Sequence, residues 1–403
     1  MTSGWQRIEP KLTATSELLA KIDGQDGLHH YLQHFNLDHD SPYVEVGGER
    51  YLMMSSYSYL GLNKDERIVA AAKQAADVYG TGAHGVRLLA GSLPIHDELE
   101  AEVAQLAGKP EAIVYSSGYV ANVGTIETLC GPDDTVFVDK IDHASIIDGC
   151  RMSGATMVRF RHNDPGHLAR RLADAPDDGI RLVVVDSVYS MDGDVAPLPA
   201  LREVCDEHGA LLMVDEAHAL GNIGPNGRGI EEHFGHAVTA DIKVGTLSKA
   251  IPSVGGYVTG PELVIQHLRY HSRPFVFSAA LPPPQAAAAL AAIRILVAEP
   301  ERVAHTQRQA GRLRAALADA GFDTGNSESA VIPLIVGSNE RAYALASACR
   351  REGVIGIPVA TPAVPNGQAR LRIAVTAVHS EADIDVAAKS FVAAAESCGV
   401  LPA

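Results

Sequence analysis

The chain has 403 residues, of which 46% are hydrophobic, and carries a formal net charge of -16 at pH 7. This length supports a large core divided among two or three packed units and excludes a small binding module. The acidic balance argues against a nucleic-acid partner and against adhesion to anionic lipid, because both require clustered Lys and Arg.

The first part of the chain, residues 1–50, is predicted to be an N-terminal arm. We expect a helix from Ser16 to Gln33 and a charged turn at residues 47–50, where Gly-Gly is followed by Glu-Arg. Glycine pairs of this kind favour a change of chain direction. The arm is therefore expected to lead into the large domain without forming a domain of its own.

Residues 51–285 are predicted to form the large domain, because short apolar runs alternate there with helix-length segments. Such runs predict a largely parallel sheet covered on both faces, with functional groups gathered at the carboxyl ends of the strands. The predicted strands are Ala112–Tyr115, Thr135–Val138, Met157–Phe160, Arg181–Asp186, Leu211–Asp215, Ile242–Gly245 and Gly256–Thr259.

Three consecutive prolines at residues 282–284 end this pattern. The alanine-rich segment Gln285–Ala298 that follows is predicted to be a long connecting helix. Helical and extended patterns then alternate to the end of the chain, so residues 286–403 are expected to form a smaller α+β domain.

Lys249 and Asp215 are the most informative charged residues, because each follows a predicted apolar strand. A lysine in low-dielectric surroundings favours its neutral amine, which can form a Schiff base. A lone lysine more often lies on the surface. However, Asp215 is followed three residues later by His218, and a carboxylate at a strand end suits a protonated pyridine nitrogen.

Three further strand ends carry polar groups that are weak signals singly. Ser116–Tyr119 opens a predicted helix whose N-terminus favours a phosphate, although Ser-Gly caps many helices. Asp142–Ser145 brings His143 to the same edge, where a histidine is more often structural. Asp186–Asp194 offers hydroxyl groups but also reads as an ordinary Asp/Gly turn. Because the three segments follow one another along one sheet edge, the functional interpretation of each becomes stronger.

Taken in order, these motifs resemble those of the α-oxoamine synthases, which are pyridoxal-phosphate enzymes of the aspartate-aminotransferase fold (fold type I). The resemblance extends from about residue 45 to the C-terminus and includes Ser58–Leu62, His96–Glu100 and Gln368–Arg372. It implies an α/β fold with a seven-stranded, mostly parallel sheet in the large domain and a smaller α+β C-terminal domain.

The same resemblance implies roles around the cofactor ring. Lys249 would carry pyridoxal 5'-phosphate and move the α-proton of the substrate, and Asp215 would pair with the ring nitrogen. His218 and Ser190 would bind the ring hydroxyl oxygen. His143 would lie over the ring face and polarise a thioester carbonyl.

Other residues are implied to bind the phosphate and the substrates. Ser117, Gly118, Tyr119 and Thr246 would hold the phosphate, with Ser278 reaching in from the partner subunit of a homodimer whose active sites lie at the subunit interface. Arg372 would clamp the amino-acid carboxylate, because its planar fork suits bidentate binding. Tyr57 and His84 are assigned to the substrate side.

The implied reaction is a decarboxylative Claisen-type condensation of serine, alanine or glycine with an acyl thioester of coenzyme A or a carrier protein. Its products are an α-amino ketone, carbon dioxide and free thiol. Tyr57, with segments 160–164, 224–229 and 273–277, looks most like serine palmitoyltransferase, although 8-amino-7-oxononanoate synthase and 2-amino-3-ketobutyrate ligase are also similar. Alternatives are an aminotransferase, an aldol-type lyase, or a non-catalytic partner subunit.

Composition also sets expectations about metals, membranes and location. His29, His30, His34 and His39 are clustered, but no carboxylate or cysteine with ligand spacing accompanies them, so we expect no metal site. Five scattered cysteines without a C-x-x-C pair favour a reducing, cytoplasmic location. The sequence lacks a run of about 18 apolar residues, so no membrane span is expected.

Overall fold

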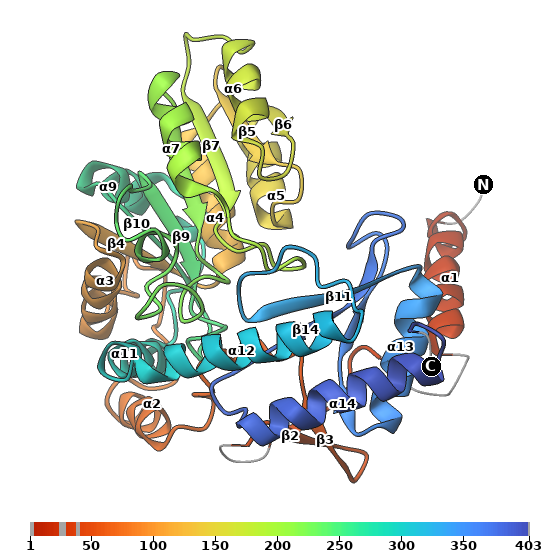
Figure 1. Ribbon diagram of the computed structural model, residues 1–403. Helices are drawn as coiled ribbons and strands as arrows, with labels where there is room; N and C mark the ends of the chain where they lie inside the picture. The colour runs from red at the N-terminus through yellow and green to blue at the C-terminus, as the bar shows by residue number, and fades with distance from the viewer. Residues whose placement is uncertain (1–3, 24–29, 38–40, 402–403) are drawn as a thin grey trace.

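The computed structural model describes residues 4–23, 30–37 and 41–401. Its centre is a seven-stranded sheet in the order β4-β10-β9-β8-β7-β5-β6, in which only β10 runs antiparallel to its neighbours (Figure 1). The sheet confirms the predicted fold class, and every predicted strand is present. The strands are β4 (Glu111–Tyr115), β5 (Thr135–Asp139), β6 (Thr156–Phe160), β7 (Arg181–Asp186), β8 (Leu211–Asp215), β9 (Ile242–Thr246) and β10 (Gly256–Gly260).

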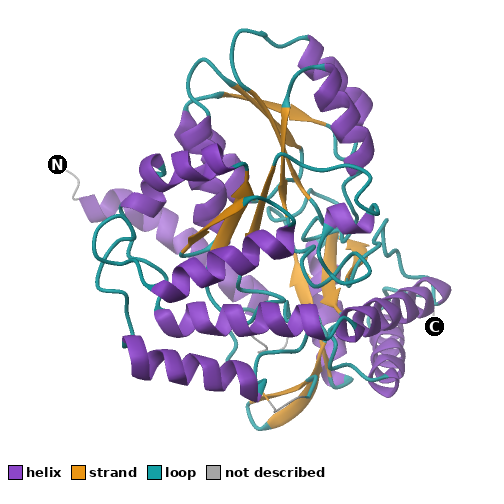
Figure 2. Cartoon of the chain, turned by 90° about the vertical axis from the view of Figure 1, so that its left-hand side faces the viewer, coloured by secondary structure: helices purple, strands orange, loops and turns teal. Residues whose placement is uncertain are grey.

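Helices cover both faces of this sheet, as Figure 2 shows. On β5, Val136 and Val138 belong to one buried cluster and Phe137 to another, because successive side chains of a strand point to opposite faces. The first cluster includes residues of α4 (Gly118–Leu129), α5 (Ala144–Ser153) and α9 (Glu262–His271). The second includes residues of α6 (Pro165–Ala173) and α7 (Leu198–Glu207). Burial on both faces explains why the strands are continuous apolar runs.

The remaining helices of this region are α2 (Glu66–Tyr79), α3 (Pro94–Ala107), α8 (Ile230–His233) and α10 (Arg273–Val276). The connecting helix α11 (Pro283–Ala298) begins two residues before the predicted start. Proline is compatible with the first turn of a helix, because the N–H groups of that turn have no partner within the helix. Alanines of α11 pack against α2 and α3 within one large apolar cluster.

The C-terminal region contains a three-stranded antiparallel sheet in the order β11-β14-β13. Its elements are α12 (Glu301–Asp319), β11 (Val331–Gly337), α13 (Asn339–Arg351), β12 (Val354–Ile355), β13 (Ile357–Val359), β14 (Ala369–Ala374) and α14 (Glu381–Ser397). In Figure 1 the long helices α12 and α14 lie side by side, and they are in contact.

The N-terminal part differs from the predicted arm. Helix α1 spans Gly4–Asp23, so it begins before Ser16, and Gln33 is not helical. Strands β1 (Asn36–Leu37), β2 (Tyr43–Val46) and β3 (Glu49–Met53) form antiparallel pairs, and β3 pairs in parallel with β12. The predicted turn joins β2 to β3, with positive φ at Gly47 and Gly48. The predicted boundary at residue 50 therefore falls inside a strand that is hydrogen-bonded to the C-terminal region.

Two of the clustered histidines, His29 and His39, lie outside the described residues. His30 is buried, stacks on Tyr343 and contacts the Ser347 hydroxyl. Within the described ranges, no group of three or more His, Cys, Asp or Glu side chains is arranged to hold a metal ion. No helix among the described residues is long and apolar enough to span a membrane.

Candidate active site

A cavity of about 210 Å³ lies beside the N-terminus of α4 and the segments that follow β5, β7, β8 and β9. Because the carboxyl ends of parallel strands meet at one sheet edge, residues far apart in sequence come together there. The cavity is lined by Ser117, Gly118, Tyr119, Asn122, His143, Ser145, Asp186, Val188, Asp215, Ala217, His218, Thr246, Ser248 and Lys249.

Lys249 follows β9 and reaches the cavity from a mostly buried loop. Burial lowers the pKa of Lys249 to about 8, although the carboxylates of Asp215 and Asp186 favour the charged amine. The positive charge of Arg372 acts in the same direction as burial. The neutral, nucleophilic amine is therefore much more accessible than in an exposed lysine.

His218 lies between Lys249 and a buried tyrosine. Its Nε2 is 2.9 Å from Lys249 Nζ, and its Nδ1 is 2.7 Å from the hydroxyl of Tyr59. Burial holds the pKa of His218 well below its ordinary value, and the charges of Lys249 and Arg372 lower it further. The imidazole is consequently neutral and can accept a hydrogen bond from the lysine.

Asp215 ends β8 and is 5% exposed. Its Oδ2 accepts a hydrogen bond of 2.6 Å from Asn122 Nδ2, and its Oδ1 accepts one of 2.9 Å from the Ala217 amide. A buried carboxylate needs such donors, and each oxygen retains capacity for a further proton donor. Asp215 is therefore suited to pair with a protonated ring nitrogen in the cavity.

The N-terminus of α4 forms a close-packed cradle at one side of the cavity. Ser117 caps the helix by accepting a hydrogen bond of 3.3 Å from the Val120 amide. A Cβ added to Gly118 would lie 3.0 Å from the Cβ of Thr246, whose hydroxyl is 2.7 Å from that of Ser248. Backbone amides at a helix N-terminus, together with these hydroxyls, suit a phosphate group.

His143 precedes α5, lines the cavity and is exposed. Its Nδ1 accepts a hydrogen bond of 3.3 Å from the backbone amide of Ser145 and lies 2.8 Å from the Ser145 hydroxyl. Although the ring is exposed to the cavity, the surrounding protein lowers the pKa of His143 through burial, against the opposing charge of Asp215. Tyr119 makes an edge contact with this ring.

Arg372 and Tyr57 lie near the cavity but outside the set of described residues that lines it. Arg372 is 3% exposed, and its Nε donates a hydrogen bond of 2.6 Å to the Ser190 carbonyl. The Tyr57 ring covers the guanidinium, with 4.4 Å from Cζ to the ring centroid, and makes an edge contact with His218. Tyr57 therefore links Arg372 to His218, which in turn contacts Lys249.

Three other predicted residues are not brought into the cavity within the described part of the chain. Ser190 touches the site through its backbone carbonyl, which binds Arg372. His84 is exposed in a loop with a φ of 62°, and Ser278 is half-buried just after α10. The roles assigned to these three side chains stay predictions.

Three residues of the site were not predicted from the sequence: Asn122, Tyr59 and Asp186. Asn122 is a fully buried amide in a helix whose other buried residues are small or apolar, and that contrast was an available signal. Asp186 is buried at the end of β7, where it aligns with Asp215 of β8. Tyr59 acts through His218 from a distant loop, and no local pattern indicated this contact.

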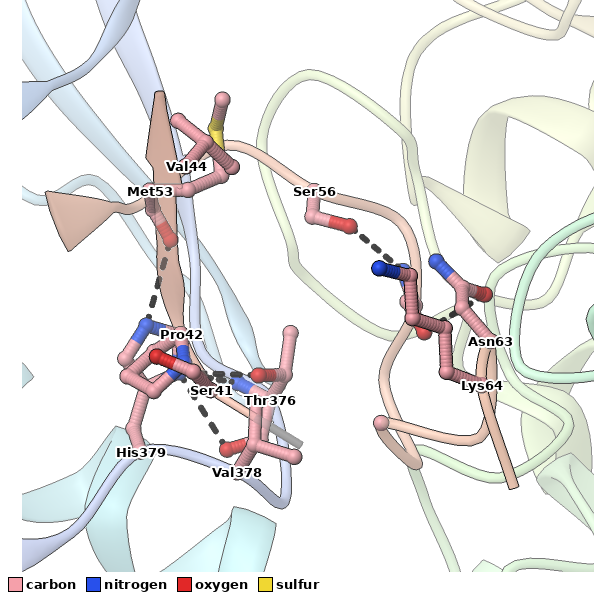
Figure 3. Close-up of a pocket in the computed structure, with 12 residues that line it drawn as sticks. Ser41, Pro42, Val44, Met53, Ser56, Asn63, Lys64, Thr376, Val378 and His379 are labelled. Atoms are coloured by element: carbon pink, nitrogen blue, oxygen red, sulfur yellow. Dashed lines mark hydrogen bonds between the residues drawn. The ribbon is translucent and has the colours of Figure 1, made fainter. Parts of the chain in front are cut away.

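A second cavity, of about 60 Å³, lies between the β2–β3 hairpin and the turn at residues 376–379 (Figure 3). Its His379 accepts a hydrogen bond from the Thr376 amide at Nδ1 and lies 3.2 Å from the Met53 carbonyl at Nε2. This imidazole is engaged with its own chain and fastens the end of β3 to the turn. Among the described residues, the two cavities share no lining residue.

The candidate active-site cavity combines a buried amine of lowered pKa, a buried carboxylate and a glycine-lined helix N-terminus. These groups fit the aldehyde, the ring nitrogen and the phosphate of pyridoxal phosphate, and the tight approach of Gly118 to Thr246 disfavours a larger residue there. Fold and site together define a pyridoxal-phosphate enzyme of the aminotransferase fold.

Comparison with known proteins agrees with this class. The family model for aminotransferases of class I and II matches residues 49–391. An 8-amino-7-oxononanoate synthase from Anaeromyxobacter dehalogenans is 46% identical over 344 residues, covering 85% of this chain and 86% of the relative. A serine palmitoyltransferase from Sphingobacterium spiritivorum is 39% identical over 366 residues, covering 91% and 92%.

A solved structure of serine palmitoyltransferase with pyridoxal phosphate superimposes with a TM-score of 0.94 at 34% identity, covering 99% of this chain and 100% of that chain. The chain belongs to the α-oxoamine synthase family of pyridoxal-phosphate-dependent acyltransferases. Its reaction class is the condensation of an amino acid with an acyl thioester.

Proposed function

We propose that this chain is a serine palmitoyltransferase-like synthase that joins L-serine, alanine or glycine to an acyl thioester of coenzyme A or a carrier protein, releasing carbon dioxide and free thiol. The observation that carries this proposal is the contact of Tyr57 with both Arg372 and His218, beside Lys249. Tyr57 is the residue by which the sequence most resembles serine palmitoyltransferase, and in the fold it covers the arginine assigned to the amino-acid carboxylate.

Lys249 is assigned to proton transfer at Cα of the amino acid. When bound, pyridoxal phosphate withdraws electrons from the bonds to that carbon. With a pKa of about 8, Lys249 Nζ can both accept and return a proton near neutral pH. His218, held by Tyr59, keeps the amine in place through its contact at Nε2.

Asp215, Asn122 and the α4 N-terminus are assigned to cofactor binding. The Asp215 carboxylate would hold the ring nitrogen in its protonated form, and Asn122 and the Ala217 amide keep that carboxylate oriented. Ser117, Gly118, Tyr119 and Thr246 would receive the phosphate, supported by the close approach of Gly118 to Thr246. His218 and Ser190 keep their assignment to the ring hydroxyl oxygen.

Arg372 is assigned to the carboxylate of the amino acid. Its Nε is already bound to the Ser190 carbonyl, and one Nη lies 3.4 Å from the Tyr59 hydroxyl. A carboxylate would therefore approach the end of the fork that carries the two Nη atoms, with Tyr57 covering the guanidinium plane. This geometry restrains the amino acid on the side of the cavity where Lys249 lies.

His143 is assigned to the acyl thioester. It lines the cavity, and its lowered pKa makes the neutral imidazole the dominant form at pH 7. A neutral imidazole can donate one hydrogen bond to a thioester carbonyl without adding a charge that would compete with Lys249 for the proton.

The second candidate is an 8-amino-7-oxononanoate synthase-like specificity, which the 46% identity to that enzyme favours. Free-thiol release distinguishes the candidates when serine, alanine and glycine are each paired with short and long acyl thioesters. Fastest turnover of serine with a long acyl thioester supports the serine palmitoyltransferase-like proposal. Fastest turnover of alanine with a short acyl thioester contradicts the serine palmitoyltransferase-like specificity and favours the second candidate.

The same assay separates the rival activities from a synthase. An aminotransferase or aldol-type lyase would consume the amino acid without releasing thiol or carbon dioxide. A non-catalytic subunit would release neither and consume nothing, although the grouping of Lys249, Asp215 and His143 supports activity. Lys249→Ala provides the inactive control for each substrate pair.

We also propose a cytoplasmic homodimer in which Ser278 reaches the phosphate site of the partner. The five cysteines are free thiols, which suits a reducing compartment, and Phe277 and Leu89 are 74% and 83% exposed, which suits an apolar interface. Coexpression of Lys249→Ala with Ser278→Ala tests the contribution from the partner. Recovery of one complete site in each heterodimer supports it, whereas no recovery relative to Ser278→Ala contradicts it.

A further inference from the structure

Asn122 connects Asp215 to Ser145, and both of these residues line the cavity. It lies on α4, is 1% exposed, and donates from Nδ2 to Asp215 Oδ2 at 2.6 Å and to Ser145 Oγ at 3.0 Å. A carboxylate can only accept, so the amide must turn its NH₂ group toward Asp215. Asn122 Oδ1 is left without a hydrogen-bond partner among the described residues. Because an unpaired buried oxygen is unfavourable, the orientation of the side chain is set by its NH₂ group.

The connection continues from Ser145 to His143. The backbone amide of Ser145 can only donate, and it points at His143 Nδ1 from 3.3 Å. The Ser145 hydroxyl accepts from Asn122, so its own proton is available for His143 Nδ1 at 2.8 Å. Both groups beside Nδ1 are donors, and Nδ1 is therefore the acceptor nitrogen of the neutral ring.

We propose that Asn122 and Ser145 are positioning residues that tie Asp215 to His143 and fix the neutral imidazole with its proton on Nε2. Because Nδ1 is turned toward the N-terminus of α5, the Nε2–H group is left for the cavity as a hydrogen-bond donor. The other tautomer would present a lone pair there and repel a carbonyl oxygen. The proposal rests on the function proposed above, in which His143 acts on the acyl thioester.

The two positioning residues differ in what they control. Asn122 holds both Asp215 and Ser145, whereas Ser145, which also lines the cavity, makes its side-chain hydrogen bonds to Asn122 and His143. Asn122→Leu should therefore weaken cofactor binding and thioester use together. Ser145→Ala should raise the KM or lower the kcat for the thioester while cofactor and amino-acid binding stay unchanged.

The apoenzyme provides a test that does not depend on activity. Diethyl pyrocarbonate acylates the unprotonated imidazole nitrogen, which in this arrangement is Nδ1, shielded by Ser145. We expect His143 to react slowly in the wild type and about five to ten times faster in Ser145→Ala, the factor that one ordinary hydrogen bond supplies. Mass spectrometry of the peptide that carries His143 measures the rate.

Two variants serve as matched controls for this labelling. Ser145→Thr keeps the hydroxyl and should label at the wild-type rate. Ser153→Ala removes a hydroxyl at the other end of α5, where it binds the Cys150 carbonyl, and should also leave the rate unchanged. Equal labelling of His143 in wild type and Ser145→Ala would overturn the proposal, as would acceleration in Ser145→Thr.

Failure of the tautomer proposal can be distinguished from failure of the proposed function. If His143→Gln, whose amide nitrogen stands near the position of Nε2, releases more thiol than His143→Asn, the donor at Nε2 is supported. Equal thiol release by these variants contradicts it. If no thioester is turned over by the wild type, the proposed function fails, while the labelling of the apoenzyme still decides the tautomer.

Discussion

Replacing Asp215 with asparagine should make the Lys249 amine easier to deprotonate. Burial lowers the pKa of Lys249 from 10.5 to about 8, and the negative charge of Asp215 is the largest influence that opposes this change. Asparagine keeps the shape of the side chain but removes the charge. The pKa of Lys249 should therefore fall further below 8 in Asp215→Asn.

The expected magnitudes are large enough to measure. With a pKa of about 8, roughly one Lys249 side chain in ten is neutral at pH 7, compared with roughly one in three thousand at the reference value, a ratio of about 300. An opposite charge within about 4–6 Å typically shifts a pKa by about one to three pH units. Asp215→Asn should lower the pKa of Lys249 by an amount near the lower end of that range, because Asp186 also favours the charged amine.

Competitive acylation of the apoenzyme with acetic anhydride measures this pKa directly. The labelled fraction of Lys249 is followed by mass spectrometry between pH 6 and pH 11, with the exposed Lys73 and Lys389 in the same digest as references for the reagent. Wild type should show an inflection near 8. An inflection near 10.5 in the wild type, or a shift toward base in Asp215→Asn, would refute the assignment of a buried, neutral amine.

Further variants test the other groups. Arg372→Ala should weaken amino-acid binding by roughly 1.5–3 kcal/mol and leave cofactor binding intact, as followed by titration of the holoenzyme; an unchanged amino-acid affinity would remove Arg372 from the carboxylate role. Gly118→Ala should weaken cofactor binding by about 1 kcal/mol or more, because its Cβ would press on Thr246 at 3.0 Å, whereas Gly131→Ala meets its neighbour at 3.9 Å and should bind normally. His162→Ala should lower the free energy of unfolding by about 2–4 kcal/mol, because Asp139 and Asp194 both lose their ion-pair partner, although each keeps a hydrogen bond from Asn163. Burial disfavours the charged ring, but those carboxylates raise the pKa of His162 to about 10. The stabilisation that His162 provides is therefore complete below about pH 6.5 and is lost as the pH rises through 10. In chemical denaturation, the free energy of unfolding should differ less between pH 6 and pH 10 in His162→Ala than in the wild type.

The strands and the strand-end residues could be predicted because they depend on local pattern and topology. Buried parallel strands are continuous apolar runs, and their carboxyl ends must meet at one edge. His143, Asp215 and Lys249 therefore came together as expected, although their segments are far apart in sequence. The seven strands were found with boundaries within about one residue of those observed.

The N-terminal region could not be predicted in the same way, because its structure depends on a distant partner. Strand β3 gains its hydrogen bonds from β2 and from β12, which lies about 300 residues later in the chain. A short strand of this kind has little local signal. Tyr59 was missed for a similar reason, since its hydroxyl acquires a role only where the fold brings it to His218.

The choice between Asp186 and Asp215 shows what the structure adds at the site itself. Both carboxyl groups are buried, end neighbouring strands at aligned positions and line the same cavity. Burial, reinforced by the nearby charge of Asp215, raises the pKa of Asp186 well above its ordinary value, which favours its protonated form. Asp215 instead accepts hydrogen bonds from Asn122 and the Ala217 amide. The helix residue Asn122 thus distinguishes these two aligned carboxyl groups, because it donates its hydrogen bond to Asp215. We therefore propose Asp215 as the partner of a pyridine nitrogen in the cavity, on the basis of a contact that strand patterns alone do not reveal.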